Sequence, residues 1–164
     1  MAAANGVSHV YIGQHGLFST PAASCYVRQL NSEHGAGYCV GAILLTASHN
    51  PGGEDEDFGI KFNSDNGGPA LERLTNAIFE HSKTILAYKI VPTLPSIDIT
   101  KVGETTFSNV GSHGALKVSV IDNVESWMNE MRKLFNFDQI KAFTNRSDFK
   151  LLFDGMHGVA GPYA

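Results

Sequence analysis

Short apolar runs alternate with segments of helical spacing in the first half of the chain. Residues 8–12 and 40–45 are such runs and predict two strands. Between them, residues 19–21 (Ser-Thr-Pro) combine a capping hydroxyl with an early proline and predict the start of a helix. This helix is expected to end before Gly35. The order strand, helix, strand favours a parallel pair with a right-handed crossover.

The second part of the pattern is more mixed. Residues 58–63 predict a strand or extended segment, and a helix is expected to start at Pro69, with Leu71, Leu74, Ile78 and Ile85 on one face. Residues 88–114 carry little periodicity and are interpreted as connecting structure rather than core. Residues 117–121 predict a strand.

Both ends of the chain look like parts of larger elements. Residues 1–6 resemble the last helical turn closed by a C′ glycine, which predicts a fold that is incomplete at its N-terminus. After the strand of residues 117–121, Asp122 or Asn123 is expected to cap an amphipathic helix that runs to Phe135. Residues 151–153 predict a strand that leads through a glycine-rich loop, residues 154–162, to a helix start. The last segment is therefore interpreted as the first βα turn of a second unit.

Composition and charge narrow the class of protein. The chain has 164 residues, 43% of them hydrophobic, which suits a globular domain with a real core. A formal charge of −4 gives no basic field, so a nucleic-acid partner is not expected. The longest apolar run is far shorter than the roughly 20 residues of a membrane span, and no signal peptide is predicted. Cys25 and Cys39 lack metal-type spacing and indicate reduced thiols, hence a cytoplasmic protein. The oligomeric state stays open.

The chemistry concentrates where the strand of residues 40–45 ends. The sequence Thr-Ala-Ser-His-Asn-Pro-Gly-Gly, residues 46–53, places Ser48, His49 and Asn50 at the carboxyl end of a strand, where ligand sites of open α/β sheets are built. No Gly-x-Ser-x-Gly elbow surrounds Ser48, so a hydrolase triad is not indicated. A phosphoserine fits better, because its charge and acceptor oxygens suit nearby imidazole, amide and ammonium groups. The alternative is a hydroxyl that only shapes a turn.

Other polar residues leave similar alternatives open. Lys61 lies inside an apolar run, where a lysine amine can act as a base, or else it points to solvent from an edge strand. His49 is either an acid/base group or a polar loop residue. The acidic run of residues 54–57 offers oxygen ligands for a hard cation, but four consecutive acids at a loop tip more often form a solvated surface.

Several motifs together resemble one enzyme family. Residues 46–53, then Asp-Phe-Gly-Ile-Lys-Phe-Asn at 57–63 and Asn-Gly-Gly-Pro at 66–69, are similar to the active-site segment of the α-D-phosphohexomutases. Residues 16–22, 79–88 and 154–163 extend the similarity to the phosphoglucomutase branch, which includes parafusin. The resemblance implies a three-layer α/β/α fold with a mixed sheet. It also implies domain I at residues 1–120, a connecting helix at 121–148 and the beginning of domain II at 149–164.

The resemblance also implies a reaction and a set of roles. Ser48 is expected to carry the phosphoryl group that interconverts glucose 1-phosphate and glucose 6-phosphate through glucose 1,6-bisphosphate. Lys61 is expected to be the general acid/base and His49 a further catalytic residue. Asn50 and Thr20, with Ser48 and Lys61, are expected to contact the sugar phosphate, and Ser48 is the only expected Mg²⁺ ligand.

Other parts of the family pattern are missing from the sequence. They are the Thr-Ser-Gly-x-Arg segment, the Asp-Gly-Asp-Gly-Asp metal loop and the Gly-Glu-x-Ser-x-Gly sugar loop. The 164 residues are therefore expected to lack mutase activity by themselves. The alternative function is a non-catalytic, parafusin-like phosphoprotein or scaffold.

Overall fold

The computed structural model describes residues 1–110 and 114–164. The chain divides into two compact units, and each is described by itself. Unit 1 comprises residues 1–17 and 71–123, and unit 2 comprises residues 18–70 and 124–164. Within the described part of the chain, no helix has both the length and the apolar character needed to cross a bilayer.

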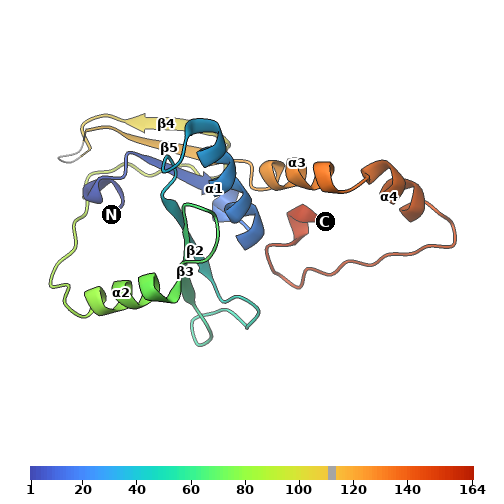
Figure 1. Ribbon diagram of the computed structural model, residues 1–164, viewed down its shortest axis with the longest axis horizontal. Helices are drawn as coiled ribbons and strands as arrows, with labels where there is room; N and C mark the ends of the chain where they lie inside the picture. The colour runs from blue at the N-terminus through green and yellow to red at the C-terminus, as the bar shows by residue number, and fades with distance from the viewer. Residues whose placement is uncertain (111–113) are drawn as a thin grey trace. The chain divides into compact units, whose positions relative to one another are not determined.

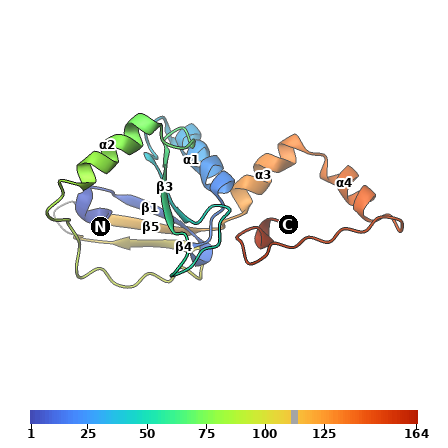
Figure 2. The same ribbon diagram turned by 90° about the horizontal axis from the view of Figure 1, so that it is seen from below.

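Unit 1 is built on a three-stranded mixed sheet. Strands β1 (His9–Gly13) and β4 (Gly103–Phe107) flank the central strand β5 (Leu116–Ile121). β1 runs parallel to β5, with Val10 beside Val118, whereas β4 runs antiparallel to it. Figures 1 and 2 both show the three strands side by side. The expected α/β class with a mixed sheet is confirmed.

The central strand β5 supplies much of the core of unit 1. Leu116, Val118 and Val120 are buried, and Leu116 and Val118 form one cluster with Ala3 and Val110. Three partly buried side chains of the loop before β4 pack against this cluster: Val91, Leu94 and Ile97. The interpretation of residues 88–114 as connecting structure is therefore wrong for the described part of this range, while residues 111–113 lie outside the described residues. The sequence did not predict β4, because β4 is an exposed edge strand. Burial therefore imposes no apolar alternation on its residues.

The remaining elements of unit 1 are short. The 3₁₀ helix η1 (Ala3–Asn5) ends at Gly6, whose φ of 91° confirms the expected C-terminal glycine. A second 3₁₀ turn, η2 (Gln14–Gly16), follows β1. Helix α2 (Glu72–Ser82) begins three residues after Pro69 and ends before Ile85, so it is shorter than predicted.

Unit 2 contains a hairpin with a long loop. Strands β2 (Gly41–Thr46) and β3 (Gly59–Ser64) pair antiparallel, with Leu44 opposite Lys61. The predicted parallel pairing of the first two strands is wrong, since β1 pairs with β5 and β2 with β3. β2 finds its partner across a loop of only twelve residues, 47–58, whose closure costs little chain entropy.

Helix α1 (Thr20–His34) covers one side of β2. The Ser19 side chain accepts a hydrogen bond from the Ala22 N–H, and the helix ends at Gly35, so both predicted ends are confirmed. On the covered side, Leu44 and Asn63 are buried. On the other side of the hairpin, Ile43, Leu45 and Ile60 remain exposed.

Two helices replace the single helix expected after residue 121. They are α3 (Glu125–Leu134), which packs on α1, and α4 (Phe137–Thr144). α3 follows Val124 rather than Asp122 or Asn123, and the Asn136 side chain caps α4 by accepting from the Gln139 N–H at 3.0 Å. Residues 151–153 form no strand in the described structure, and the chain ends in the 3₁₀ helix η4 (Gly161–Tyr163).

Candidate phosphoryl-transfer site

The candidate site begins with a strained turn directly after β2. Ser48 has a φ of 64°, a left-handed conformation that is uncommon for a residue other than glycine. Its backbone N–H donates to Thr46 Oγ1 at 2.9 Å, and the Asn50 N–H donates to the Ala47 carbonyl at 3.2 Å. Such backbone strain is concentrated at functional sites, where the surroundings hold the residue in place. Sequence reasoning missed this feature, because composition does not reveal the φ of a serine.

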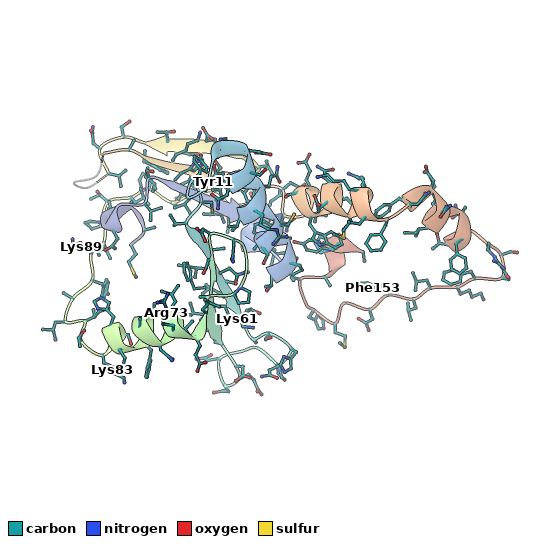
Figure 3. All side chains as sticks on the ribbon, viewed as in Figure 1. Tyr11, Lys61, Arg73, Lys83, Lys89 and Phe153 are labelled. Carbon is teal, nitrogen blue, oxygen red and sulfur yellow. The ribbon has the colours of Figure 1, made fainter. Side chains whose placement is uncertain are left out.

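Two nitrogen groups meet the Ser48 hydroxyl. Lys61 Nζ donates to Ser48 Oγ at 3.2 Å, and His49 Nδ1 lies 3.4 Å from the same oxygen. The antiparallel register brings Lys61 to this position, since β3 returns beside the strand that leads into the serine loop. Figure 3 shows Lys61 on β3. Of the residues predicted for the site, Ser48, Lys61 and His49 are therefore brought together.

The electrostatics of this group favour an anion on the serine. An ammonium within hydrogen-bond distance stabilises negative charge on the hydroxyl oxygen or on a phosphoryl group attached to it. Ser48, His49 and Lys61 are all exposed, so a ligand can reach them. Lys61 is exposed although its neighbours in the sequence are apolar.

Asn50 and Thr20 lie differently from the three residues around the hydroxyl. The Asn50 amide donates to the Asp57 carboxylate, and the Asp57 N–H donates to the Pro51 carbonyl, so these contacts close the loop. Thr20 is exposed at the first residue of α1. Among the described residues, no hydrogen bond joins Thr20 to Ser48 or Lys61.

The acidic run of residues 54–57 supplies too few ligands for a metal site. Asp57 supports the loop through Asn50, and all four acids of residues 54–57 are exposed. The described residues contain no group of three or more His, Cys, Asp or Glu that could hold a metal ion. Mg²⁺ requires about six oxygen ligands, and Ser48 would supply one beside the positive charge of Lys61. The described residues do not fit a complete magnesium site.

A buried asparagine on β3 connects the strand that carries Lys61 to helix α1. Asn63, two residues after Lys61 on β3, is only 2% exposed, and its amide donates to Ser24 Oγ at 2.9 Å and to the Gly67 carbonyl at 3.0 Å. Gly67 has a φ of 77°, and a Cβ there would lie 2.3 Å from the Ser24 carbonyl oxygen. Sequence reasoning did not single out Asn63. The available sequence signal for its burial was that this polar residue shares a face of the hairpin with the apolar Leu44.

A second asparagine joins the loops on either side of β2 and β3. Asn31 near the end of α1 accepts from the Cys39 N–H at 2.7 Å, and its amide donates to the Cys39 and Asp65 carbonyls at 2.9 and 2.7 Å. These bonds tie the chain before β2 and the turn after β3 to the same helix. The hairpin that presents Ser48 and Lys61 is thus held largely by directional polar contacts.

Comparison with known proteins gives one consistent family. Residues 1–89 match the family model described as phosphoglucomutase/phosphomannomutase, alpha/beta/alpha domain I. The cytoplasmic phosphoglucomutase of Pisum sativum is 47% identical over 164 residues, which are 100% of this chain and 28% of the relative. Phosphoglucomutase 2 of Saccharomyces cerevisiae is 46% identical over 167 residues, covering 99% of this chain and 28% of the relative.

A solved structure shows the same fold. The crystal structure of the exocytosis-sensitive phosphoprotein pp63/parafusin, a phosphoglucomutase from Paramecium in its open form, matches with a TM-score of 0.86 and 43% identity. The match covers 99% of this chain and 29% of that chain. The present chain thus spans 28% of the length of both curated relatives.

Proposed function

The chain belongs to the phosphoglucomutase/phosphomannomutase family, and from this membership we propose that it is the phosphoserine-bearing part of a phosphoglucomutase. The proposed reaction interconverts glucose 1-phosphate and glucose 6-phosphate through glucose 1,6-bisphosphate, in cytoplasmic carbohydrate metabolism. The observation that supports it best is the contact of 3.2 Å between Lys61 Nζ and the hydroxyl of Ser48 in a strained, exposed turn. The relatives from Pisum sativum and two other plants are named as cytoplasmic phosphoglucomutases.

Ser48 is the proposed phosphoryl carrier. When it is charged by glucose 1,6-bisphosphate, a bond forms between Ser48 Oγ and phosphorus, and the bond from phosphorus to the sugar oxygen breaks. The serine hydroxyl loses its proton and the departing sugar oxygen gains one. Lys61 is the proposed acid/base group for this exchange, because its nitrogen already contacts Ser48 Oγ. In the reverse direction the same groups return the phosphoryl group to a sugar monophosphate.

His49, Asn50 and Thr20 have supporting roles in the proposal. His49 Nδ1, 3.4 Å from the hydroxyl oxygen, is placed to donate to a phosphoryl oxygen in the tautomer or charge state that carries a proton there. Asn50 holds the loop through Asp57 and offers its remaining polar groups to the sugar phosphate. Thr20, exposed at the start of α1, is proposed as a further contact to the sugar phosphate.

Magnesium enters the proposal only through Ser48. When bound, Mg²⁺ would neutralise charge on the phosphoryl group of Ser48. Its other ligands are not supplied by the described residues. Residues 1–120 are proposed to be domain I, residues 121–148 the connection and residues 149–164 the beginning of domain II. The family model over residues 1–89 supports the first of these assignments.

Labelling of Ser48 tests the proposal directly. The full-length phosphoglucomutase proposed to contain this chain is incubated with glucose 1,6-bisphosphate that carries radioactive phosphorus, and the modified residue is located by mass spectrometry. We expect label on Ser48, none in Ser48→Ala, and full labelling in the control Ser147→Ala, which removes an exposed serine elsewhere. An unlabelled wild-type full-length protein, or label that persists in Ser48→Ala, would refute the proposed role.

A phosphoprotein without mutase chemistry is the second candidate. It is favoured by the similarity to parafusin, which is described as an exocytosis-sensitive phosphoprotein as well as a phosphoglucomutase. The two functions differ in what happens to the phosphoryl group. A mutase carrier returns the label to added glucose 6-phosphate, whereas a regulatory phosphoserine keeps it. Release of labelled bisphosphate from the purified, labelled full-length protein therefore separates them.

A further inference from the structure

The C-terminal segment contacts the beginning of α1. η4 carries Tyr163, whose hydroxyl oxygen accepts a hydrogen bond from the Ser19 backbone N–H at 3.1 Å, across 144 residues of sequence. The Tyr163 ring also meets Trp127 of α3 edge to face, with centroids 5.4 Å apart and an angle of 84° between the rings. An edge-to-face pair is a favourable arrangement of two aromatic rings. Tyr163 therefore contacts both the start of α1 and helix α3.

The residue that Tyr163 contacts defines the first turn of the helix. Ser19 Oγ accepts from the Ala22 N–H at 3.3 Å, and the Ser19 carbonyl accepts from the Ala23 N–H at 2.9 Å. With its own N–H bonded to Tyr163, Ser19 has its N–H, its carbonyl and its hydroxyl engaged. The orientation of Ser19 is thus determined by Tyr163 as well as by the first turn of α1. Thr20 follows directly and is exposed.

A tight turn precedes the contact. The Gly158 N–H donates to the Gly155 carbonyl at 2.8 Å, and both intervening residues, Met156 and His157, have positive φ angles of 47° and 66°. The Met156 N–H donates to Asp154 Oδ1 at 2.9 Å, which supports this costly conformation. Two consecutive non-glycine residues in the left-handed region indicate that the path of this segment is determined by more than local preference.

We infer that Tyr163 is a positioning residue: through the Ser19 N–H it holds the first turn of α1 and thereby orients Thr20 toward the sugar phosphate. The orientation of Thr20 toward the sugar rests on the proposed function, whereas the contact of Tyr163 with Ser19 does not. Trp127 keeps the phenol ring in the place where its hydroxyl reaches Ser19. The glycine-rich segment of residues 154–163 thus takes part in arranging a residue of the site.

The contact itself is tested with Tyr163→Phe in the full 164-residue chain. This variant keeps the ring and removes the acceptor, so we expect the Ser19 amide to exchange its hydrogen about fivefold faster by NMR, the size expected for one neutral hydrogen bond. Trp127 is the only tryptophan of the chain, so its fluorescence reports on the aromatic pair. Emission should stay unchanged in Tyr163→Phe and shift to longer wavelength in Tyr163→Leu. Tyr88→Phe, at an exposed tyrosine, is the control.

The positioning role is tested by the rate at which glucose 1,6-bisphosphate labels Ser48 of the full-length protein proposed to contain this chain. In Tyr163→Phe we expect the half-saturating sugar concentration to rise about fivefold, again the size of one neutral hydrogen bond, with an unchanged maximal rate. A purely structural role would lower the maximal rate together with the melting temperature. Unchanged Ser19 exchange would overturn the contact, and an unchanged half-saturating concentration would overturn the positioning role. A wild-type full-length protein that takes no label would refute the proposed function and the role of Thr20, while Ser19 exchange in the 164-residue chain would still decide the contact.

Discussion

β5 and β2 are both apolar strands, but they differ in what covers them. β5 is the central strand of unit 1, and its Val118 is 2% exposed. β2 belongs to a two-stranded hairpin, in which Leu44 is 6% exposed while Ile43 and Leu45 are 72% and 64% exposed. An apolar run thus predicts a strand without predicting whether one face or both are buried. The apolar side chains of β2 are buried on the α1 side only.

The two strands also differ in whether they contribute mainly to stability or to the candidate site. Unit 1 is held by close packing of aliphatic side chains around β5. The hairpin that carries Ser48 and Lys61 depends on hydrogen bonds from Asn31 and Asn63 as well as on its contact with α1. Hydrogen bonds fix direction more than aliphatic packing does, which suits a loop that must hold one hydroxyl in a strained conformation. Substitutions in the core of unit 1 should therefore lower the free energy of unfolding, whereas substitutions around the serine loop should slow the labelling of Ser48.

The largest effect is expected for Lys61→Ala. Loss of the acid/base group should slow labelling of Ser48 by about 10²- to 10⁴-fold. The melting temperature should stay nearly constant, because Lys61 is exposed. Stopped labelling assays at saturating glucose 1,6-bisphosphate measure the rate, with the exposed Lys89→Ala as control. A rate within threefold of wild type would show that the contact with Ser48 Oγ has no catalytic role.

The next effect compares two identical substitutions. Val118→Ala removes two methyl groups from the packed core and should lower the free energy of unfolding by about 2 kcal/mol. Val40→Ala, at a side chain 71% exposed beside β2, should change it by less than about 0.5 kcal/mol. Urea unfolding followed by circular dichroism measures both values. Equal losses would mean that the Val40 side chain is covered in solution, and the comparison would fail.

Asn63→Ala should lower the stability of the chain and also slow the labelling of Ser48. It leaves Ser24 Oγ and the Gly67 carbonyl without the amide that donates to them, at a cost of about 1–2 kcal/mol. Because Asn63 lies two residues from Lys61, we also expect slower labelling of Ser48. Asn76→Ala, at an exposed position of α2, is the matched control. A destabilised variant that is labelled at the normal rate would contradict the link between this bond and the site.

The smallest effect concerns alkaline pH. Burial, with a further contribution from Glu33, raises the pKa of Tyr26 on α1 from 10.0 to about 12. The unfolded chain releases this proton near pH 10 while the folded chain keeps it, so the stabilising contribution is complete below pH 10 and is lost as the pH rises through about 12. Tyr26→Phe should flatten the loss of stability over this range. An unchanged slope in urea unfolding at pH 9 to 11.5 would exclude Tyr26 as its source.

The sequence by itself determined the features that depend on near neighbours. Ser19 and Gly35 predicted both ends of α1, Gly6 predicted the end of η1, and the serine-loop motif indicated the family and the residues around the Ser48 hydroxyl. Caps, turns and such motifs act over a few residues, so their signals are complete within a short window.

Only the tertiary structure decided what depends on distant partners. The pairing of β1 with β5, the edge strand β4 and the hydrogen bond of Tyr163 to Ser19 each join segments that sequence order does not relate. The strained φ of Ser48 belongs to the same group, because a conformation that the residue disfavours persists only when contacts around it compensate. Strand partners and strain are set by competition among all possible contacts of the chain, and periodicity along one segment does not contain that information.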